Sequence, residues 1–337
     1  MEIKVKASKN YSVIIKDNLD DLESLVSAFP CEKVAIITDQ NVKNLYGNLL
    51  DKYFKNKQIF HYDLASGEDS KNATKYFEIL NFLASNNFSR NDLIVAFGGG
   101  VTGDLTGFVA STFVRGITLI QVPTTLLSMV DSSVGGKTAI NLEQGKNLVG
   151  TFYQPSLVYI NTEFVKTLPK RELNSGLGEI IKYCFIGGDL TLEDVRSGNL
   201  KNTIYKCVKI KRDIVEKDEK ESGDRKLLNL GHTVGHAIEK ASNFSISHGE
   251  CVLKGLKISL DISLKLGVLS KENYSKGLEI LNLSSCDLNN EYSKDELINF
   301  IKSDKKGNGE KVDFIVVNDK LLSQVESIEY SKLYNLM

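Results

Sequence analysis

The feature that most constrains the fold is a continuous apolar run, Asp92–Phe97, that leads directly into three glycines, Gly98–Gly100. Such a run is typical of a strand buried on both faces, as in parallel sheets. Similar runs occur at Lys33–Thr38 and Ile117–Val122, and the helical periodicity of Lys71–Ala84 lies between them. Because short apolar runs alternate with helical segments, we expect an α/β domain with a mostly parallel sheet. In the helical segment we expect one inward face, formed by Tyr76, Phe77, Leu80 and Leu83.

The second half of the chain follows a different pattern. All four prolines lie at or before Pro169, and helical periodicity runs through Leu200–Lys217 and Cys251–Leu266. No β-branched run occurs there until Val312–Val317. This pattern predicts a largely α-helical domain. Since 337 residues are too many for one ordinary core, we predict two domains, 1–165 and 166–337.

Composition excludes several classes of function. The formal net charge is −1, so no overall field favours nucleic acid or an anionic membrane surface. No apolar stretch approaches the ~20 residues that span a bilayer, and the first residues lack the apolar core of a signal peptide. The five cysteines include no CxxC pair, which predicts reduced thiols. We expect a cytoplasmic protein that binds neither nucleic acid nor membrane.

The glycines after the first apolar run resemble a phosphate-binding loop. Residues 98–104, GGGVTGD, fit the pattern GxGxxG between a strand and a helix, where a bare backbone and free N–H groups can approach a pyrophosphate. The pattern alone is weak, because Ser111–Val130 lacks the acidic residue expected ~20 positions later for the ribose. A tight turn with positive φ would also explain the glycines. We favour phosphate binding by a variant Rossmann-like fold, in which Asp39 and Asn41 contact the ribose.

Three of the four histidines lie close together, at His232, His236 and His248. On a helix the first two share a face, and the polar residues 243–247 could end that helix and return the chain toward it. Imidazole is the commonest metal ligand and titrates near neutral pH. Two histidines alone would suit a helix surface. Three at this spacing predict a metal centre, an acid/base centre, or both.

Several lysines lie beside glycines or carboxylates. Lys137 and Lys146 each follow a glycine, which suits a backbone that bends round an anion, although either lysine alone is better explained as solvated. Glu179 and Lys182 stand three apart, hence on one face if helical. The simpler interpretation of these two residues is a surface ion pair, which contributes little to the stability of the fold.

A series of motifs covers nearly the whole length of the chain: TDQN (38–41), GEDSK (67–71), GGGVTGDLTGFVAST, RGITLIQVPTTLLSMVDSSVGGKTAIN, GKNLVG, GEIIK, DEKESGDRKLLNLGHTVGHAIE, SHGE and SDKK. In these motifs the chain resembles the 3-dehydroquinate synthase family. Several of these motifs are long and specific. The resemblance implies a dehydroquinate synthase-like fold, with an α/β N-terminal domain that binds NAD and a mainly α-helical C-terminal domain that binds metal and substrate. It also implies a homodimer.

The resemblance further implies one divalent metal ion, held by Glu179, His232 and His248. Two histidines and a glutamate with open positions are typical of catalytic zinc, and cobalt or iron would accept the same ligands. His236 stays free of the metal in this assignment. It matches a position for acid/base work or substrate contact, and Glu221 matches the family's other proton-transfer position.

The remaining matches are implied contacts with substrate and cofactor. The substrate positions are Asp131, Lys137, Lys146, Asn147, Lys182, Lys211, Arg225, Asn229 and Lys305, with Lys306 as the alternative to Lys305. The NAD positions are Asp39, Asn41, Glu68, Lys71, Gly99, Gly100, Val101, Asp104, Thr124, Thr125, Lys137, Lys146, Phe164 and Thr167. The resemblance thus implies that Asp39 and Asn41 do the work of the missing ribose-binding acid.

The implied activity is the second step of the shikimate pathway, toward aromatic amino acids. It converts the sugar phosphate 3-deoxy-D-arabino-heptulosonate 7-phosphate to 3-dehydroquinate and phosphate. NAD oxidises the substrate transiently, phosphate is eliminated, the hydride returns, and an intramolecular aldol step closes the ring. The lysines and the arginine would hold the carboxylate and the phosphate of the substrate.

Three other functions stay open. One is a metal-dependent polyol or glycerol-phosphate dehydrogenase, although a small neutral polyol does not need so many cations. Another is a related sugar phosphate cyclase, which would differ at the residues that bind the carboxylate. The third is an inactive regulator that binds metal and nucleotide, against which the presence of Glu221 and His236 argues.

Overall fold

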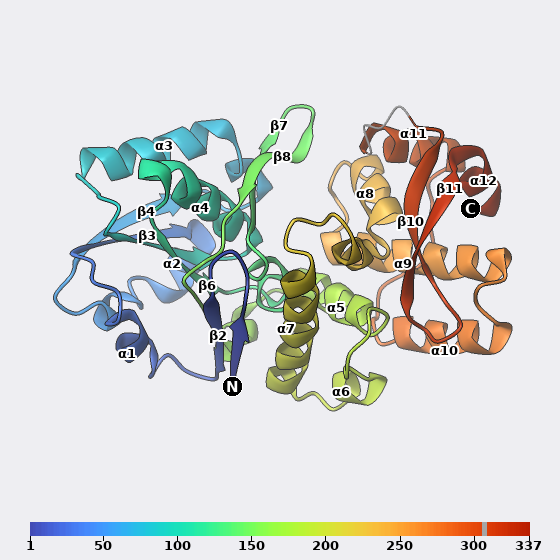
Figure 1. Ribbon diagram of the computed structural model, residues 1–337, viewed down its shortest axis with the longest axis horizontal. Helices are drawn as coiled ribbons and strands as arrows, with labels where there is room; N and C mark the ends of the chain where they lie inside the picture. The colour runs from blue at the N-terminus through green and yellow to red at the C-terminus, as the bar shows by residue number, and fades with distance from the viewer. Residues whose placement is uncertain (305–308) are drawn as a thin grey trace. The chain divides into compact units, whose positions relative to one another are not determined.

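A seven-stranded sheet organises the first part of the chain, in the order β1-β2-β9-β6-β5-β3-β4. The computed structural model describes residues 1–304 and 309–337 and divides into two units, Met1–Leu168 and Pro169–Met337 (Figure 1). Only β1 pairs antiparallel in this sheet, and the other neighbours are parallel. This confirms the mostly parallel sheet. Its strands are β1 (Glu2–Val5), β2 (Tyr11–Lys16), β3 (Lys33–Asp39), β4 (Gln58–Leu64), β5 (Leu93–Gly98), β6 (Thr118–Pro123) and β9 (Leu157–Asn161).

Four α-helices belong to this unit: α1 (Leu22–Val26), α2 (Gln40–Tyr46), α3 (Ala73–Ser85) and α4 (Gly100–Thr112). The predicted inward face of α3 is wrong at Phe77, whose side chain is 60% exposed. The buried positions on α3 are Ile79 and Leu83. Phe77 precedes Ile79 by two residues, about 200° round a helix, so the two side chains cannot share one face.

A two-stranded hairpin, β7 (Lys137–Leu142) and β8 (Gly145–Phe152), packs against α4. Glycines make this approach possible. A Cβ atom on Gly107 of α4 would lie 2.4 Å from the Thr138 Cγ2 atom of β7. Between the two strands, a Cβ atom on Gly150 would lie 2.0 Å from the Thr138 carbonyl oxygen. The hairpin therefore carries Lys137 and Lys146 on a segment held against the helix that follows the glycine loop.

The second unit is largely helical, as predicted. Its helices are α5 (Lys170–Tyr183), α6 (Leu192–Arg196), α7 (Leu200–Lys217), α8 (His232–Ala241), α9 (His248–Leu266), α10 (Lys271–Leu281), α11 (Lys294–Asp304) and α12 (Tyr330–Leu336). The β-branched run near its end forms β10 (Lys311–Val317), which pairs antiparallel with β11 (Ser323–Glu329). Among the described residues, no helix is long and apolar enough to cross a membrane.

Close contacts at glycines set the spacing of three helices in this unit. A Cβ atom on Gly249 of α9 would lie 2.0 Å from the Ser175 carbonyl oxygen of α5, and one on Gly178 would lie 2.4 Å from the Gly249 carbonyl oxygen. On the α8 side, a Cβ atom on Gly255 would lie 2.0 Å from the Gly231 carbonyl oxygen. Helix α9 therefore approaches α5 and the start of α8 at backbone distance.

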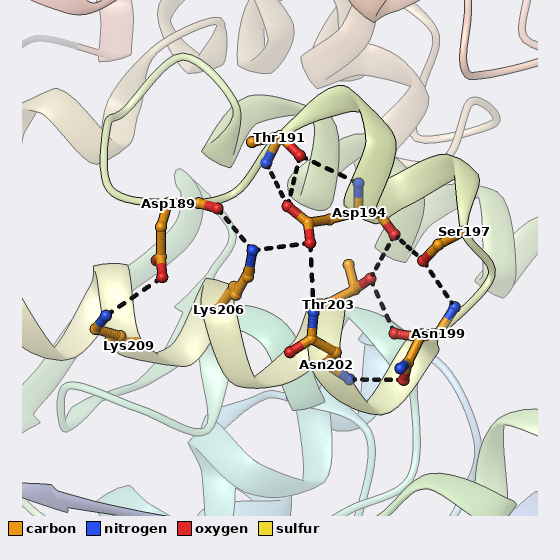
Figure 2. A network of polar contacts seen from close by, with 9 residues as sticks. All are labelled: Asp189, Thr191, Asp194, Ser197, Asn199, Asn202, Thr203, Lys206 and Lys209. Atoms are coloured by element: carbon orange, nitrogen blue, oxygen red, sulfur yellow. Dashed lines mark hydrogen bonds and ion pairs between the residues drawn. The ribbon is translucent and has the colours of Figure 1, made fainter.

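Asp194 ties α6 to α7 through a network of polar contacts (Figure 2). Its carboxylate accepts hydrogen bonds from the Thr191 backbone N–H (2.8 Å) and hydroxyl (2.6 Å) and contacts the Lys206 ammonium at 2.8 Å. The bonds from Lys206 and Thr191 lower the Asp194 pKa to about 2, from an ordinary 3.8. The charged form of Asp194 is thus stabilised in the folded protein.

Replacing Asp194 by Asn should lower the free energy of unfolding by about 1–2 kcal/mol at pH 7, since bonds to a charged group are lost. Because the pKa is depressed on folding, the contribution of Asp194 is present above about pH 4 and is lost as the pH falls toward 2. Urea unfolding of both proteins between pH 7 and pH 3 measures the difference. Glu193→Gln, on a side chain 81% exposed, is the control with little expected effect. Equal stability of Asp194→Asn and the original protein at pH 7 would contradict the assignment.

Candidate metal centre and glycine loop

Two of the clustered histidines stand at helix N-termini. Helix α8 begins at His232, after Gly231 in the left-handed region (φ 77°). Helix α9 begins at His248, behind a capping box formed by Ser247 and Glu250. Residues 243–247 do separate the two helices, as predicted, but α8 already ends at Ala241 with Ser242 as its C-cap, and Phe244 and Ile246 in this segment are apolar. The His232 Nδ1 atom lies 3.1 Å from the Leu230 carbonyl oxygen, which orients the ring so that Nε2 faces α5.

Glu179 of α5 completes the group. Its Oε1 atom lies 3.3 Å from His232 Nε2 and 3.2 Å from His248 Nε2. Ligand atoms bound tetrahedrally to zinc at 2.0–2.1 Å are about 3.3–3.4 Å apart. These three side chains form one of two groups among the described residues that could hold a metal ion. The two distances from Glu179 are therefore those expected if the predicted ligand set holds a zinc-sized ion.

The pair formed by Glu179 and Lys182 is not at the surface. Each side chain is 1% exposed, and the Lys182 Nζ atom lies 2.5 Å from the Glu179 Oε2 atom. The simpler interpretation as a solvated pair is thus wrong, because α5 turns this face into the interior of the second unit. With Oε2 facing the ammonium and Oε1 facing both imidazoles, Glu179 offers one oxygen to a metal.

Charges around this carboxylate set three pKa values. Burial would raise the Glu179 pKa, but Lys182 and the imidazoles hold it well below its usual range. Burial lowers the His232 pKa to about 4 despite the attraction of Glu179. For His248, burial lowers the pKa, but Glu179 and Glu239 outweigh it and raise the pKa to about 9. The Glu179 carboxylate is therefore held in the charged form that a cation binds.

His236 lies beside this group. Its ring centroid is 5.4 Å from that of His232 and 5.9 Å from that of His248. His236, His248 and Glu239 form the second group that could hold a metal ion. Glu239 was not predicted as a site residue. A signal was present, since Glu239 follows His236 by three positions and His232 by seven, on one face of α8.

A strained loop presents Glu221. This residue has φ 60°, in the left-handed region that non-glycine residues rarely adopt, and its Oε1 atom accepts a hydrogen bond of 2.7 Å from Asn229 Nδ2. Asp218 braces the loop by accepting from the backbone N–H groups of Gly223 (2.7 Å) and Arg225 (3.0 Å). Strain of this kind is typical of functional sites. The structure thus brings the predicted Glu221 and Asn229 together.

Besides Lys182, two further predicted cations of the second unit are buried. Arg225 is 1% exposed and donates to the Glu219 carbonyl oxygen. Lys211 is buried on α7. Lys305 and its alternative Lys306 lie outside the described residues.

In the first unit, β5 ends at Gly98 and α4 begins at Gly100. None of Gly98, Gly99 and Gly100 has positive φ, so the tight-turn explanation is wrong. The glycines are needed for space: a Cβ atom on Gly98 would lie 2.5 Å from Thr102 Oγ1, and one on Gly99 3.0 Å from Thr125 Cγ2. No side chain caps the N-terminus of α4. The loop therefore retains the bare backbone that phosphate binding requires.

Asp39 lies at the carboxyl end of β3, which pairs with β5. Its Oδ1 atom caps α2 by accepting from the Asn41 (3.0 Å) and Val42 (3.2 Å) backbone N–H groups. Its Oδ2 atom lies 3.5 Å from Thr102 Oγ1, beside the glycine loop. Asp39 therefore holds Asn41 at the start of α2, and Thr102 is a neighbour that sequence reasoning missed.

A buried lysine joins several of the other predicted cofactor residues. Lys71, 4% exposed, contacts Asp104 of α4 and the Asn147 side-chain oxygen of β8. Asn141 of β7 donates to Glu68 (2.7 Å) and accepts from the Asn147 backbone N–H (2.9 Å). Asn141 was also missed, although it ends the motif that contains Lys137. The cluster groups predicted NAD residues with Asn147, a predicted substrate contact.

Other predicted residues of the first unit lie in the segments that follow the carboxyl ends of β5, β6 and β9. Thr124 follows β6 and donates its backbone N–H to the Gly98 carbonyl oxygen at 2.9 Å. The Phe164 ring, 3% exposed, packs against Tyr46 and Phe97, so it shapes this edge rather than offering a polar group. Val101 follows Gly100 in α4, Asp131 lies in the short π-helix Ser128–Ser132, and Thr167 ends the 3₁₀ helix Thr162–Thr167.

The chain matches two family models. Residues 61–175 match the 3-dehydroquinate synthase N-terminal model, and residues 176–307 match the 3-dehydroquinate synthase C-terminal model. A 3-dehydroquinate synthase from Clostridium acetobutylicum is 40% identical over 342 residues, covering 97% of this chain and 96% of that protein.

Solved structures share the fold. A 2-deoxy-scyllo-inosose synthase complexed with carbaglucose-6-phosphate, NAD+ and Co2+ has a TM-score of 0.90 at 24% identity, covering 100% of this chain and 99% of that one. A 2-epi-5-epi-valiolone synthase from Streptomyces hygroscopicus, with NAD+ and Zn2+ bound, has a TM-score of 0.86 at 22% identity and covers 100% and 98%.

Proposed function

The chain belongs to the 3-dehydroquinate synthase family, and on this premise we propose that it converts 3-deoxy-D-arabino-heptulosonate 7-phosphate to 3-dehydroquinate and phosphate. The proposed cofactors are NAD and one divalent metal ion. The observation that carries the proposal is the convergence of Glu179, His232 and His248 on one point. The match to both family models favours this activity over a dehydrogenase on the same fold.

The metal site is supported by its donor set. Glu179, His232 and His248 would hold zinc or cobalt, the ions named with the two solved relatives. When bound, the metal lowers the pKa of a coordinated substrate hydroxyl and so eases its deprotonation. The buried Lys182 ammonium keeps Glu179 charged and fixes which oxygen faces the histidines.

The NAD site is supported by the glycine loop and its neighbours. The bare backbone at Gly98–Gly100 and the N-terminus of α4 suit a pyrophosphate, and Asp39 with Asn41 lies beside them. NAD supplies a reversible hydride acceptor, which is regenerated in each turnover. Both solved relatives described above contain NAD+.

The chain's own residues supply proton transfer and anion binding. We assign proton transfer to His236, beside the ligand histidines, and to Glu221, whose carboxylate is held by Asn229. The substrate carries a carboxylate and a phosphate, whereas the chain has a net charge of −1. Local cations must therefore hold it, and we assign this role to Lys137, Lys146, Lys182, Lys211, Arg225 and Lys305.

The purified protein, given the heptulosonate phosphate, zinc or cobalt, and NAD below the substrate concentration, should release phosphate and form 3-dehydroquinate in amounts exceeding the NAD present. Phosphate assay and product chromatography measure both. Absence of phosphate release, or NADH accumulating one-for-one with product, would contradict the proposal. We also propose a homodimer, which sedimentation would test.

A further inference from the structure

The imidazole of His248 lies between two carboxylates on two different helices. Its Nε2 atom lies 3.2 Å from Glu179 Oε1, on α5. Its Nδ1 atom, on the opposite side of the ring, lies 3.6 Å from Glu239 Oε2, on α8. Glu179 is already explained as a proposed metal ligand. Glu239 has no role in the proposed reaction.

A buried carboxylate such as that of Glu239 destabilises the fold unless it is paired. The Glu239 side chain is buried, and carboxylates are seldom buried unless they are paired. It projects from the same face of α8 as His232 and His236. The end of α8 is held as well, because the Glu239 carbonyl oxygen accepts from the Ser242 hydroxyl and the Phe244 backbone N–H at 2.9 Å each. The backbone that carries the Glu239 carboxylate is therefore held in place.

A carboxylate on the far nitrogen of a metal-binding histidine has a known physical effect. It fixes the ring orientation, keeps the proton on that nitrogen, and increases the basicity of the nitrogen that faces the metal. A distance of 3.6 Å is longer than a hydrogen bond, so the Glu239 carboxylate acts on the ring here through its charge. Both nitrogens of His248 are then accounted for, with Nε2 toward the ligand group and Nδ1 toward Glu239.

We propose that Glu239 is a positioning residue that orients His248 and strengthens its Nε2 atom as a metal ligand. The inference rests on the proposed function, since it takes His248 as a ligand. The competing interpretation is that Glu239, His236 and His248 hold a second metal ion. We favour positioning, because a second ion would have to share the ring of His248 with the first.

The test compares metal affinity, with Zn2+ and Co2+ as probes, in the original protein, Glu239→Gln and Glu250→Gln. Chelator competition measures the affinity, and the visible absorption of bound Co2+ reports the ligand field. Glu239→Gln should weaken binding about 10- to 100-fold and change the Co2+ spectrum. Glu239→Asp keeps the charge on a shorter side chain, so its metal affinity should lie between those of the original protein and Glu239→Gln.

Glu250→Gln is the matched control. Glu250 also lies close to His248, but its carboxylate caps α9 by accepting from the Ser247 backbone N–H (3.2 Å) and hydroxyl (2.8 Å). The metal affinity of the Glu250→Gln variant should stay within about twofold of that of the original protein. Urea unfolding of the metal-free variants separates a loss of stability from a loss of affinity.

The outcomes are distinguishable. Equal metal affinity of Glu239→Gln and the original protein would overturn this inference and leave the proposed function standing. Binding of two metal ions per chain by the original protein and of one by Glu239→Gln would also overturn this inference, because Glu239 would then be a metal ligand. An original protein that binds neither Zn2+ nor Co2+ would overturn the proposed metal site, and this inference with it.

Discussion

His248→Ala should abolish tight metal binding, whereas His236→Ala should bind metal like the original protein and lose turnover by about 100- to 10,000-fold. The reason lies in which nitrogen faces Glu179. The Nε2 atoms of His232 and His248 lie 3.3 and 3.2 Å from its Oε1 atom. His236 belongs to the same cluster of rings but not to the group that contains Glu179. Its removal should therefore take away proton transfer and leave the ligands.

Metal content after dialysis, chelator competition and steady-state rates of phosphate release measure the two effects. The histidine variants also serve as controls for each other, because both remove an imidazole from the same cluster. Equal loss of metal in the two variants would show that the ligands are wrongly assigned. An unchanged rate in His236→Ala would remove it from the proton-transfer role.

Gly249→Ala should destabilise the protein by about 3 kcal/mol and weaken metal binding at least tenfold. The added Cβ atom would lie 2.0 Å from the Ser175 carbonyl oxygen. Backbone cannot move aside as a flexible side chain can, so α9 and α5 must separate. Glu179 is on α5 and His248 begins α9, and their 3.2 Å contact depends on that spacing.

Urea unfolding and chelator competition measure the two consequences. Gly277→Ala is the matched control, since the atoms nearest to a Cβ on this helical glycine of the same unit are the side-chain ends of Leu260, at 3.1 Å, and the Phe185 ring. Leu260 can shift slightly, so we expect a smaller loss of stability and unchanged metal affinity. If Gly249→Ala kept its metal affinity, the contact between α5 and α9 would not be what sets the ligand spacing.

The secondary structure was largely predictable because it depends on local patterns. Apolar runs such as Asp92–Phe97 predicted buried parallel strands, and residues 243–247 were correctly expected to separate two helices, α8 and α9. Phe77 shows the limit of such patterns. Its apolar character suggested burial, but whether a helical position is buried depends on which face meets the rest of the fold.

The candidate site was predictable only where motif and resemblance supplied the partners. From the histidines alone, His232 and His236 looked like the natural pair, because they share a helix face. The structure instead places His232 with His248 and with Glu179, which lies more than fifty positions earlier in the chain. No local spacing could reveal that, and Thr102 was missed for the same reason, whereas Asn141 and Glu239 stood within motifs that the sequence already marked.

Local chemistry in the chain was enough to indicate an α/β unit, a helical unit, a glycine loop and a cluster of histidines. It could not distinguish a surface ion pair from the buried one between Glu179 and Lys182. That distinction, and the grouping of Glu179 with His232 and His248, depend on helix packing at Gly178, Gly249 and Gly255. Close approach of backbones is a property of two segments at once, so neither segment's sequence contains it alone.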